Sequence, residues 1–338
     1  MGTRLLITLD YELFFGREVG SVHNCMIHPI DELAKLVDRF GAKLTLFVDA
    51  GYLDKLKRAA PDNDDLQQDY AVISEQLQRL TKDGHDVQLH IHPHWEDTEY
   101  VDGGWRIDTG RYRLHDYAPE AVEEIVTRYK KALTDIVGDS IFAYRAGGWC
   151  MQPFDPIGDA LHNQGIWLDS TVYDEGMSPD DIRGFDFRGA PKKSLWRFES
   201  DPVKEVERGR FLEIPITACR VWPSFYWKMV FIKKFARGDF KPYGDGAAMV
   251  ANAAYYRELL TKVTNTVTSI DGAKAGLLEK SYRSLLASGR EPIFNVMGHP
   301  KAMSPYSLKK LEAFLLAHPE IEPVTFQYFK GMKLQKRA

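Results

Sequence analysis

The feature that most constrains the fold is a regular alternation of short apolar segments with amphipathic ones, several of which end at a glycine. Arg4–Thr8 and Lys43–Val48 have the length and apolar content of buried strands, whereas Asp31–Phe40, followed by Gly41, has helical spacing. This alternation is typical of βα units around a parallel sheet. At 338 residues, 44% of them apolar, the chain can bury a large core.

The same rhythm continues along the rest of the chain. Further strands are expected over Asp86–Ile91, Ile141–Tyr144, Ile166–Leu168, Phe211–Ile214, Pro292–Val296 and Pro323–Phe326. Helices are expected over Asp69–Lys82, Pro119–Val137, Asp155–Asn163, Ala254–Val267, Gly276–Ala287 and Ser307–Ala317. Two stretches, about 95–117 and 176–245, interrupt the rhythm. They are interpreted as insertions in a single catalytic domain spanning 1–338, since no linker or repeat marks a boundary.

The charge balance disfavours nucleic acid as a partner. The chain has 48 acidic and 44 basic residues, a formal charge of −4, and lacks a long basic block that would attract a phosphate backbone. The apolar run Leu5–Leu9 is interrupted at Asp10 and is too short for a secretion signal or a spanning helix. The sequence therefore predicts a cytoplasmic protein without a transmembrane segment.

Residues 220–241, within the second insertion, interleave aromatic side chains with lysine and arginine. Three interpretations are open. The most ordinary is a helix that covers the sheet, and the second is a wall on which sugar rings stack. The third is a segment that rests on lipid headgroups, in contact with a membrane or a lipid-linked substrate.

The strongest local signal for chemistry is the sequence HIHPHW, from His90 to Trp95. His90 and His94 stand four residues apart where a strand runs into a loop, so both imidazoles can converge on one metal ion. His92 lies between them, and its role is open between a substrate contact, a partner of a ligand and an ordinary hydrogen-bonded residue.

A second signal is TLDYELFFG, from Thr8 to Gly16, in which a buried strand ends at Asp10 and Glu12. A spacing of two places both carboxylates on one face of a strand. Two ionised acids so close together repel, which is tolerable when a cation lies between them or when one of them is a catalytic base.

Two weaker signals also follow predicted strands. In YRAGGW, Arg145 precedes a pair of glycines that permit a tight turn, and Trp149 closes the motif. In NVMGHP, His299 comes directly after an apolar strand. Because the carboxyl ends of parallel strands meet at one edge of a sheet, all four motifs are expected at the same edge.

Taken together and in this order, the four motifs resemble the polysaccharide deacetylase family, carbohydrate esterase family 4, which includes chitin and peptidoglycan deacetylases. The resemblance covers Thr8 to about Pro300. It implies a distorted (β/α) barrel of seven or eight strands. It also implies a hydrolase that uses a divalent metal, expected to be Zn²⁺, to remove acetyl groups from an N-acetylated saccharide through its linear amide bond.

The resemblance further implies a role for each matching residue. Glu12, His90 and His94 would bind the metal, Asp10 would act as base and His299 as acid. Arg145 would orient the base, and Asp169, with Asp174 as a reserve, would pair with the acid. The residues that would contact substrate are Tyr11, His92, Trp95 and Trp149.

The chain departs from the common family pattern in ways that leave alternatives open. It has Asp-Tyr-Glu where many members carry adjacent aspartates, so the roles of Asp10 and Glu12 are open to exchange. Ile91 replaces the usual serine or threonine between the metal histidines. Two other functions remain: hydrolysis of a small non-sugar amide such as a cyclic ureide, and glycan binding without catalysis.

Overall fold

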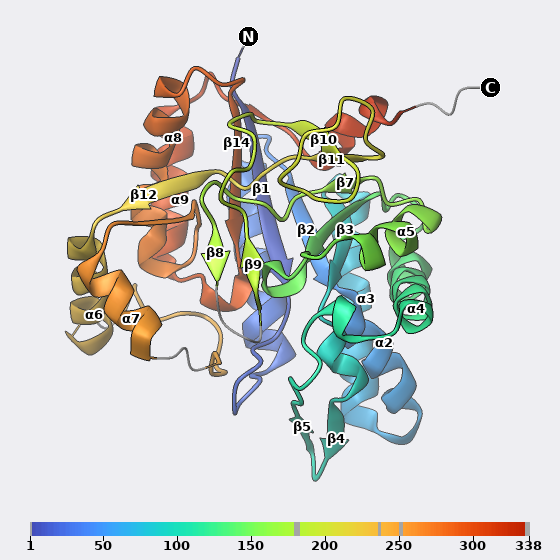
Figure 1. Ribbon diagram of the computed structural model, residues 1–338. Helices are drawn as coiled ribbons and strands as arrows, with labels where there is room; N and C mark the ends of the chain where they lie inside the picture. Colours follow the sequence, from blue (N-terminus) through green and yellow to red (C-terminus); the bar gives the residue numbers. More distant parts are fainter. Residues whose placement is uncertain (1, 179–182, 236–237, 250–252, 335–338) are drawn as a thin grey trace. The chain divides into compact units, whose positions relative to one another are not determined.

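The protein, seen in a computed structural model that describes residues 2–178, 183–235, 238–249 and 253–334, has an α/β fold (Figure 1). Over these residues, nine strands form one main, mostly parallel sheet, and helices alternate with its strands along the chain. This arrangement confirms the predicted α/β class and the distorted (β/α) barrel. No helix in the described ranges has both the length and the apolar character needed to cross a membrane.

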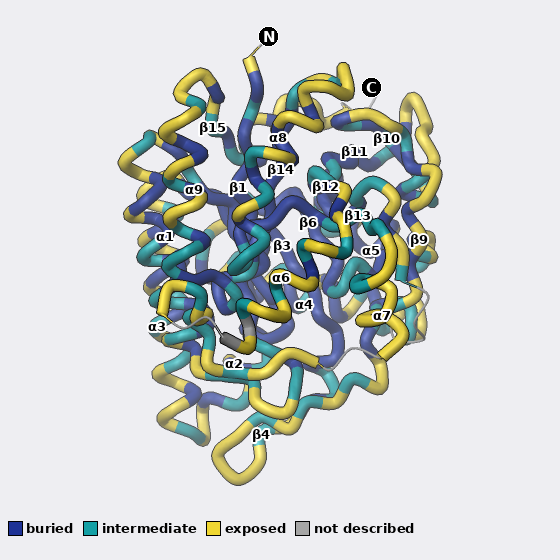
Figure 2. The backbone as a smooth tube through the Cα atoms, turned by 90° about the vertical axis from the view of Figure 1, so that its left-hand side faces the viewer, coloured by how far each residue is buried: buried dark blue, intermediate teal, exposed yellow. Residues whose placement is uncertain are grey.

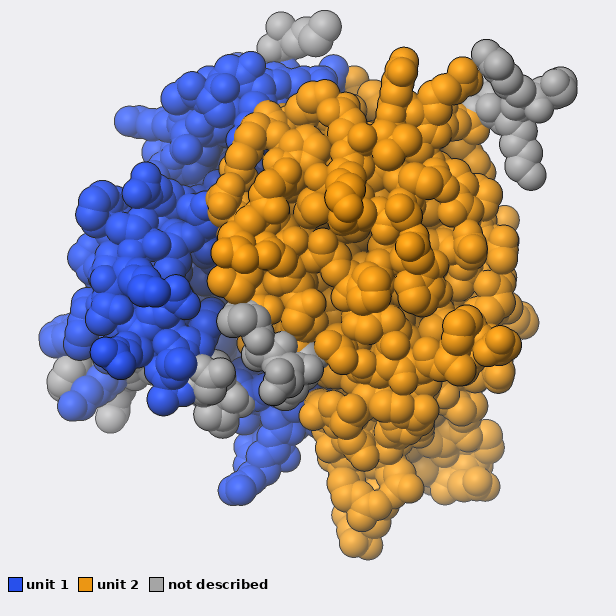
Figure 3. Space-filling model, viewed as in Figure 1, with its two compact units in different colours: residues 1–44, 216–323 blue, residues 45–215, 324–338 orange. Residues whose placement is uncertain are grey.

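The chain divides into two compact units, each made from two separate stretches of sequence (Figure 3). Unit 1 comprises Met1–Leu44 and Ile216–Pro323, and unit 2 comprises Thr45–Pro215 and Val324–Ala338. That the chain acts as one catalytic domain with two insertions stays a prediction.

Unit 1 is organised around the parallel pair β1 (Arg4–Tyr11) and β14 (Ile293–Gly298). Both strands are buried almost throughout, as expected for parallel strands that are covered on both faces (Figure 2). The short strand β15 (Glu322–Pro323) also pairs with β1. The helices of this unit are α1 (His28–Asp38), α6 (Pro223–Phe235), α7 (Ala253–Thr261), α8 (Leu278–Ala287) and α9 (Pro305–Ala317).

Unit 2 contains most of the remaining strands of the main sheet. Their order is β10 (Trp196–Phe198), β11 (Phe211–Glu213), β7 (Leu168–Asp169), β6 (Ala143–Ala146), β3 (Asp86–Ile91) and β2 (Leu44–Asp49). The β10–β11 pair is antiparallel, whereas β11–β7, β7–β6, β6–β3 and β3–β2 are parallel. The helices are α2 (Ala50–Ala59), α3 (Asp64–Lys82), α4 (Pro119–Val137) and α5 (Asp155–Asn163).

Three small antiparallel pairs lie outside the main sheet. They are β4 (Glu99–Val101) with β5 (Gly104–Arg106), β8 (Met177–Ser178) with β9 (Phe185–Asp186), and β12 (Ala218–Val221) with β13 (Thr264–Val267). The first two fall in the stretches interpreted as insertions. The second stretch also contains β11, however, so part of it belongs to the main sheet.

Most predicted elements are present, and β3, α4 and α5 have the predicted bounds. The helix predicted over 254–267 is wrong in its second half, because α7 ends at Thr261 and Thr264–Val267 forms β13. The sequence TNTV is rich in β-branched residues, which favour a strand. Helix α2 was not predicted, and the strand predicted over 323–326 is reduced to the two residues of β15.

A buried glutamine ties β3 to the start of β6. The backbone ladder between these strands begins only at Leu89 and Tyr144. One residue earlier, the Gln88 side-chain oxygen accepts the backbone N–H groups of Phe142 and Ala143 at 2.9 and 2.8 Å. Gln88 is fully buried, so its side chain replaces a backbone partner where water cannot reach.

We predict that Gln88→Leu destabilises the protein by about 2–5 kcal/mol, because two buried N–H groups lose their acceptor. The measurement is urea unfolding followed by circular dichroism. Gln68→Leu, an exposed change on α3, is the matched control and is expected to stay within about 0.5 kcal/mol of the parent. Equal unfolding midpoints for the Gln88 variant and the parent would contradict the assigned role.

Candidate active site

The end of β1 brings two carboxylates together with a histidine. Asp10 and Glu12 are both buried, with 6% and 5% of their surface exposed. The parallel register pairs Leu9 with Gly298, so the residue after β14 lies beside Asp10. The His299 Nε2 atom is 3.7 Å from Asp10 Oδ2 and 3.8 Å from Glu12 Oε1.

Asp271 holds the other side of the His299 ring. One oxygen of Asp271 lies 2.8 Å from His299 Nδ1, and the other accepts the backbone N–H of His299 at 2.7 Å. The segment is fixed along β14, because Ile270 donates its backbone N–H to Met297. An ionised carboxylate can only accept hydrogen bonds, so Nδ1 of His299 carries a hydrogen atom. The other ring nitrogen, Nε2, faces Asp10 and Glu12.

The charges around His299 set its protonation. Burial by itself lowers the pKa of this histidine, but the charge and hydrogen bond of Asp271, together with the charges of Asp10 and Glu12, raise it more. The net result is a pKa above the ordinary histidine value. For Asp271, burial raises the pKa while His299 lowers it, and the net shift is downward. Both shifts favour a charged histidine paired with a carboxylate.

The predicted partner of His299 was Asp169, and the structure corrects this to Asp271. Asp169 accepts hydrogen bonds from the backbone N–H and the hydroxyl of Thr171 at 2.8 and 2.9 Å. The reserve candidate, Asp174, forms an ion pair with Lys192. The sequence carried a signal for Asp271, because this residue follows a run of β-branched residues that contains β13. Asp10 likewise lies at the end of a strand. The helix predicted over this run concealed it.

Asp169 instead belongs to a buried pair of acids. The parallel register places it opposite Glu213, which the sequence reasoning missed. Burial raises the pKa of Asp169, and burial together with the charge of Asp169 raises that of Glu213. The pair therefore retains a proton under conditions in which two exposed acids would be ionised.

Arg145 is almost fully buried, at 1% exposure. Its Nε atom donates to the backbone oxygen of Ser170 at 2.8 Å, and its guanidinium carbon lies 4.1 Å from the centre of the Phe47 ring. These contacts fix the side chain in one orientation. Its role in orienting Asp10 stays a prediction.

Lys301 is a further charged residue that the sequence reasoning missed. It is buried at 7% exposure, and its ammonium lies 2.9 Å from Glu12 Oε1. It also donates to the backbone oxygen of Leu13. The two acids at the end of β1 are therefore accompanied by a buried cation from the turn that follows His299.

Two histidines share one face at the end of β3. The backbone stays extended through His92, with φ −112° and ψ 98°, so His90 and His92 obey the alternation of a strand. Their ring centres are 4.8 Å apart. The His90 Nδ1 atom lies 2.8 Å from the backbone oxygen of Arg145, and because a carbonyl oxygen only accepts, Nδ1 carries the hydrogen.

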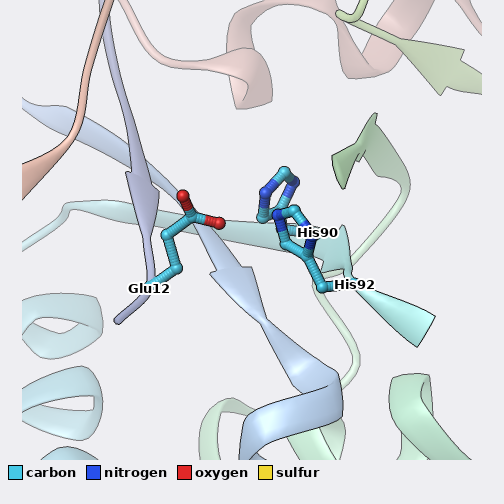
Figure 4. Close-up of side chains that lie close together, drawn as sticks. All are labelled: Glu12, His90 and His92. Carbon is cyan, nitrogen blue, oxygen red and sulfur yellow. The ribbon is translucent and has the colours of Figure 1, made fainter. Parts of the chain in front are cut away.

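Glu12, His90 and His92 together have the composition of a metal site. All three are buried, and one ligand atom from each lies within 4.8 Å of the others, the one such group over the described residues (Figure 4). Two imidazoles and a carboxylate are donors that Zn²⁺ accepts. The ammonium of Lys301 opposes a second cation, and its contact with Glu12 is made at Oε1. The donors therefore fit a divalent ion.

This group differs from the predicted ligand set at one position, because it contains His92 in place of His94. Pro93 begins a short 3₁₀ helix, Pro93–Glu96, which ends the strand alternation before His94. The His94 ring instead stacks on Trp95 and Tyr112, with ring centres 5.3 and 5.7 Å away. Two histidines that are two residues apart can approach the same ion when the strand continues through both of them.

Two of the predicted substrate contacts are core residues. Trp95 has no exposed surface, donates its indole N–H to Asp49 at 2.6 Å and packs on Tyr52. Tyr11 is likewise fully buried in β1. Trp149 is only partly buried and has a positive φ of 63°, so it remains a candidate for substrate contact.

We predict that Asp271→Asn lowers the pKa of His299. Removing the carboxylate leaves the effect of burial, which disfavours the charged ring. In the parent, the raised pKa adds stability that is fully present below about pH 6.5 and is lost as pH rises through the folded-state value. Titration of the histidine ring signals by NMR measures the shift. An unchanged midpoint for His299 would show that Asp271 does not control its charge.

The sequence matches no family model, and no curated protein matches it. Solved structures do show similarity. A Mycobacterium smegmatis protein described as a polysaccharide deacetylase is 16% identical, with a TM-score of 0.46, covering 100% of this chain and 94% of that one. The polysaccharide deacetylase Bc1974 of Bacillus cereus is 12% identical, with a TM-score of 0.41 and coverages of 96% and 93%.

A structure of another named activity is also similar. The GH57-type branching enzyme of Pyrococcus horikoshii is 13% identical, with a TM-score of 0.49, covering 100% of this chain and 72% of that one. Two of these three structures bear the name of the family that the sequence motifs resemble. At such low identity, the function has to be inferred from the side chains themselves.

Proposed function

We propose that the protein is a metal-dependent hydrolase that removes acetyl groups from an N-acetylated saccharide. The observation that carries the proposal is the arrangement at His299. Its Nδ1 atom is held by Asp271 at 2.8 Å, and its Nε2 atom faces Asp10 and Glu12 at 3.7 and 3.8 Å. Hydrolysis of an amide needs a base for water and an acid for the leaving nitrogen, and this arrangement supplies both types of group.

The two proton transfers are assigned to Asp10 and His299. Asp10 accepts a proton from the water that attacks the acetyl carbonyl. His299 then donates the Nε2 proton to the nitrogen as the carbon–nitrogen bond breaks, so that acetate and a free amine leave. The raised pKa of His299 supports this step, because the ring must be protonated before it can donate.

Glu12 is assigned to the metal rather than to proton transfer. Its contact with the Lys301 ammonium at 2.9 Å fixes one carboxylate oxygen, which suits a stationary ligand better than a group that takes up a proton. When bound to Glu12, His90 and His92, a divalent ion such as Zn²⁺ would polarise the acetyl carbonyl and lower the pKa of water. The chain's own residues then need only orient the substrate and move protons.

The ligand assignment predicts different effects for two neighbouring histidines. His92→Gln is expected to weaken Zn²⁺ binding about 100-fold or more, because a direct ligand matters at least as much as the groups that support one. His94→Gln, its matched control, changes a residue outside the group and is expected to weaken binding by less than about tenfold. Calorimetric titration of metal-free protein measures both. The reverse order of effects would restore His94 as the ligand.

The proposed activity is tested by acetate release from N-acetylated oligosaccharides with Zn²⁺ supplied. Asp10→Asn and His299→Gln are each expected to lower kcat by roughly 10²- to 10⁴-fold while the protein still binds the metal. Asp108→Asn, an exposed change, serves as the control. Failure to release acetate from a broad panel would refute the proposal. Turnover of a cyclic ureide without metal would assign the site to the other chemistry.

A further inference from the structure

Helix α6 carries large apolar side chains on its outer side as well as on its inner side. Its inner side, formed by the buried Tyr226 and the partly buried Phe225 and Met229, packs on Cys219 and Val221 of β12. Its outer side and the residue before it expose large apolar groups, namely Trp222 (60%), Trp227 (57%), Val230 (49%) and Phe231 (65%). A helix on the surface of a soluble protein normally turns polar residues outward. The outer side of α6 therefore needs an explanation that core packing does not provide.

The exposed apolar residues of α6 form one continuous strip. Trp227, Val230, Phe231 and Lys234 stand at positions i, i+3, i+4 and i+7, so they lie on one helical face. The adjacent helix α7 adds exposed Tyr255 and Tyr256, at 47% and 51%. We call the exposed apolar and aromatic residues of this region the aromatic surface; they are Trp222, Trp227, Val230, Phe231, Tyr255 and Tyr256. Figure 2 shows much of both helices in the exposed colour.

The same segment is strongly basic. Residues 220–241 contain six lysines and arginines but a single acid, Asp239, a net charge of +5 in a chain whose total is −4. Lys228 and Lys234 are exposed on α6 itself. Apolar rings flanked by lysines match the two components of a lipid surface, an acyl boundary and anionic headgroups.

The ring of Trp227 is held in place while it faces outward. Its indole N–H donates to the backbone oxygen of Leu260 on α7 at 3.1 Å, although the residue is 57% exposed. On the inner side, the hydroxyl oxygen of Tyr226 lies 3.2 Å from the hydroxyl oxygen of Thr264. The outward ring of Trp227 is thus ordered before it contacts any partner, which reduces the conformational entropy lost on binding.

The charge distinguishes among occupants. A second copy of the chain would bring the exposed Lys228 and Lys234 against the same lysines at a symmetric contact, which is unfavourable. A neutral sugar would stack on the rings but would gain little from the lysines. We propose that α6 and α7 dock the protein onto the surface of an anionic lipid bilayer through the aromatic surface. This proposal does not depend on the metal or on acetyl transfer to water.

The test is sedimentation of the full-length protein with lipid vesicles. Binding is expected to phosphatidylcholine vesicles that contain phosphatidylglycerol, and much less to phosphatidylcholine alone. It should weaken as salt is added, because exposed charges are screened. A shift of tryptophan fluorescence to shorter wavelength on vesicle addition is expected as the rings leave water.

Two double variants separate the apolar and charged contributions. Trp227→Ser with Phe231→Ser, and Lys228→Glu with Lys234→Glu, are each expected to reduce the vesicle affinity about tenfold or more. Leu316→Ser, on α9, is the matched control, since Leu316 is as exposed as Phe231, at 66% against 65%, and lies outside the aromatic surface. Circular dichroism and the melting temperature verify that each variant is folded.

Several results would overturn the proposal. Absence of binding to either vesicle, equal binding to both, or parental binding by the folded double variants would each exclude an anionic bilayer as the occupant. Sedimentation velocity that shows a dimer lost in the Trp227/Phe231 variant would assign the surface to a second copy. Ring-dependent binding of neutral oligosaccharides, without vesicle binding, would assign it to a sugar.

Discussion

The arrangement at His299 depends on the parallel register between β1 and β14. Pairing Leu9 with Gly298 places the next residues of the two strands, Asp10 and His299, beside each other. A shift of one residue would turn every side chain of β1 to the other face and separate the acids from the histidine. Burial on both faces of the pair enforces the register, since the alternative would place Asp10 where an apolar residue of β1 now packs.

The ends of strands were the most predictable part of the site. Asp10, Glu12, His90 and His299 were identified because each follows an apolar run, and residues at such ends gather at one edge of a parallel sheet. The fold class followed from the same alternation. The sequence did not indicate the conformation of the chain just beyond a strand. That conformation decides which histidine lies beside His90. The chain stays extended through His92 and turns at Pro93, so His92 lies beside His90.

Partners that come from distant segments were also beyond prediction. Asp271 reaches His299 because its segment runs along β14, and Glu213 meets Asp169 because β11 pairs with β7. Both contacts are set by the order of strands, which local periodicity does not encode. Burial was equally hard to foresee: Trp95 carries the residue type of a sugar contact, but its hydrogen bond to Asp49 and its packing on Tyr52 make it part of the core.

The ammonium of Lys301 gives the end of β1 an internal counterion. Burying two carboxylates without a nearby positive charge would cost folding free energy. A chain of that kind would fold only with a bound metal ion. With the lysine in place, a protein with the proposed metal site can fold before the metal binds.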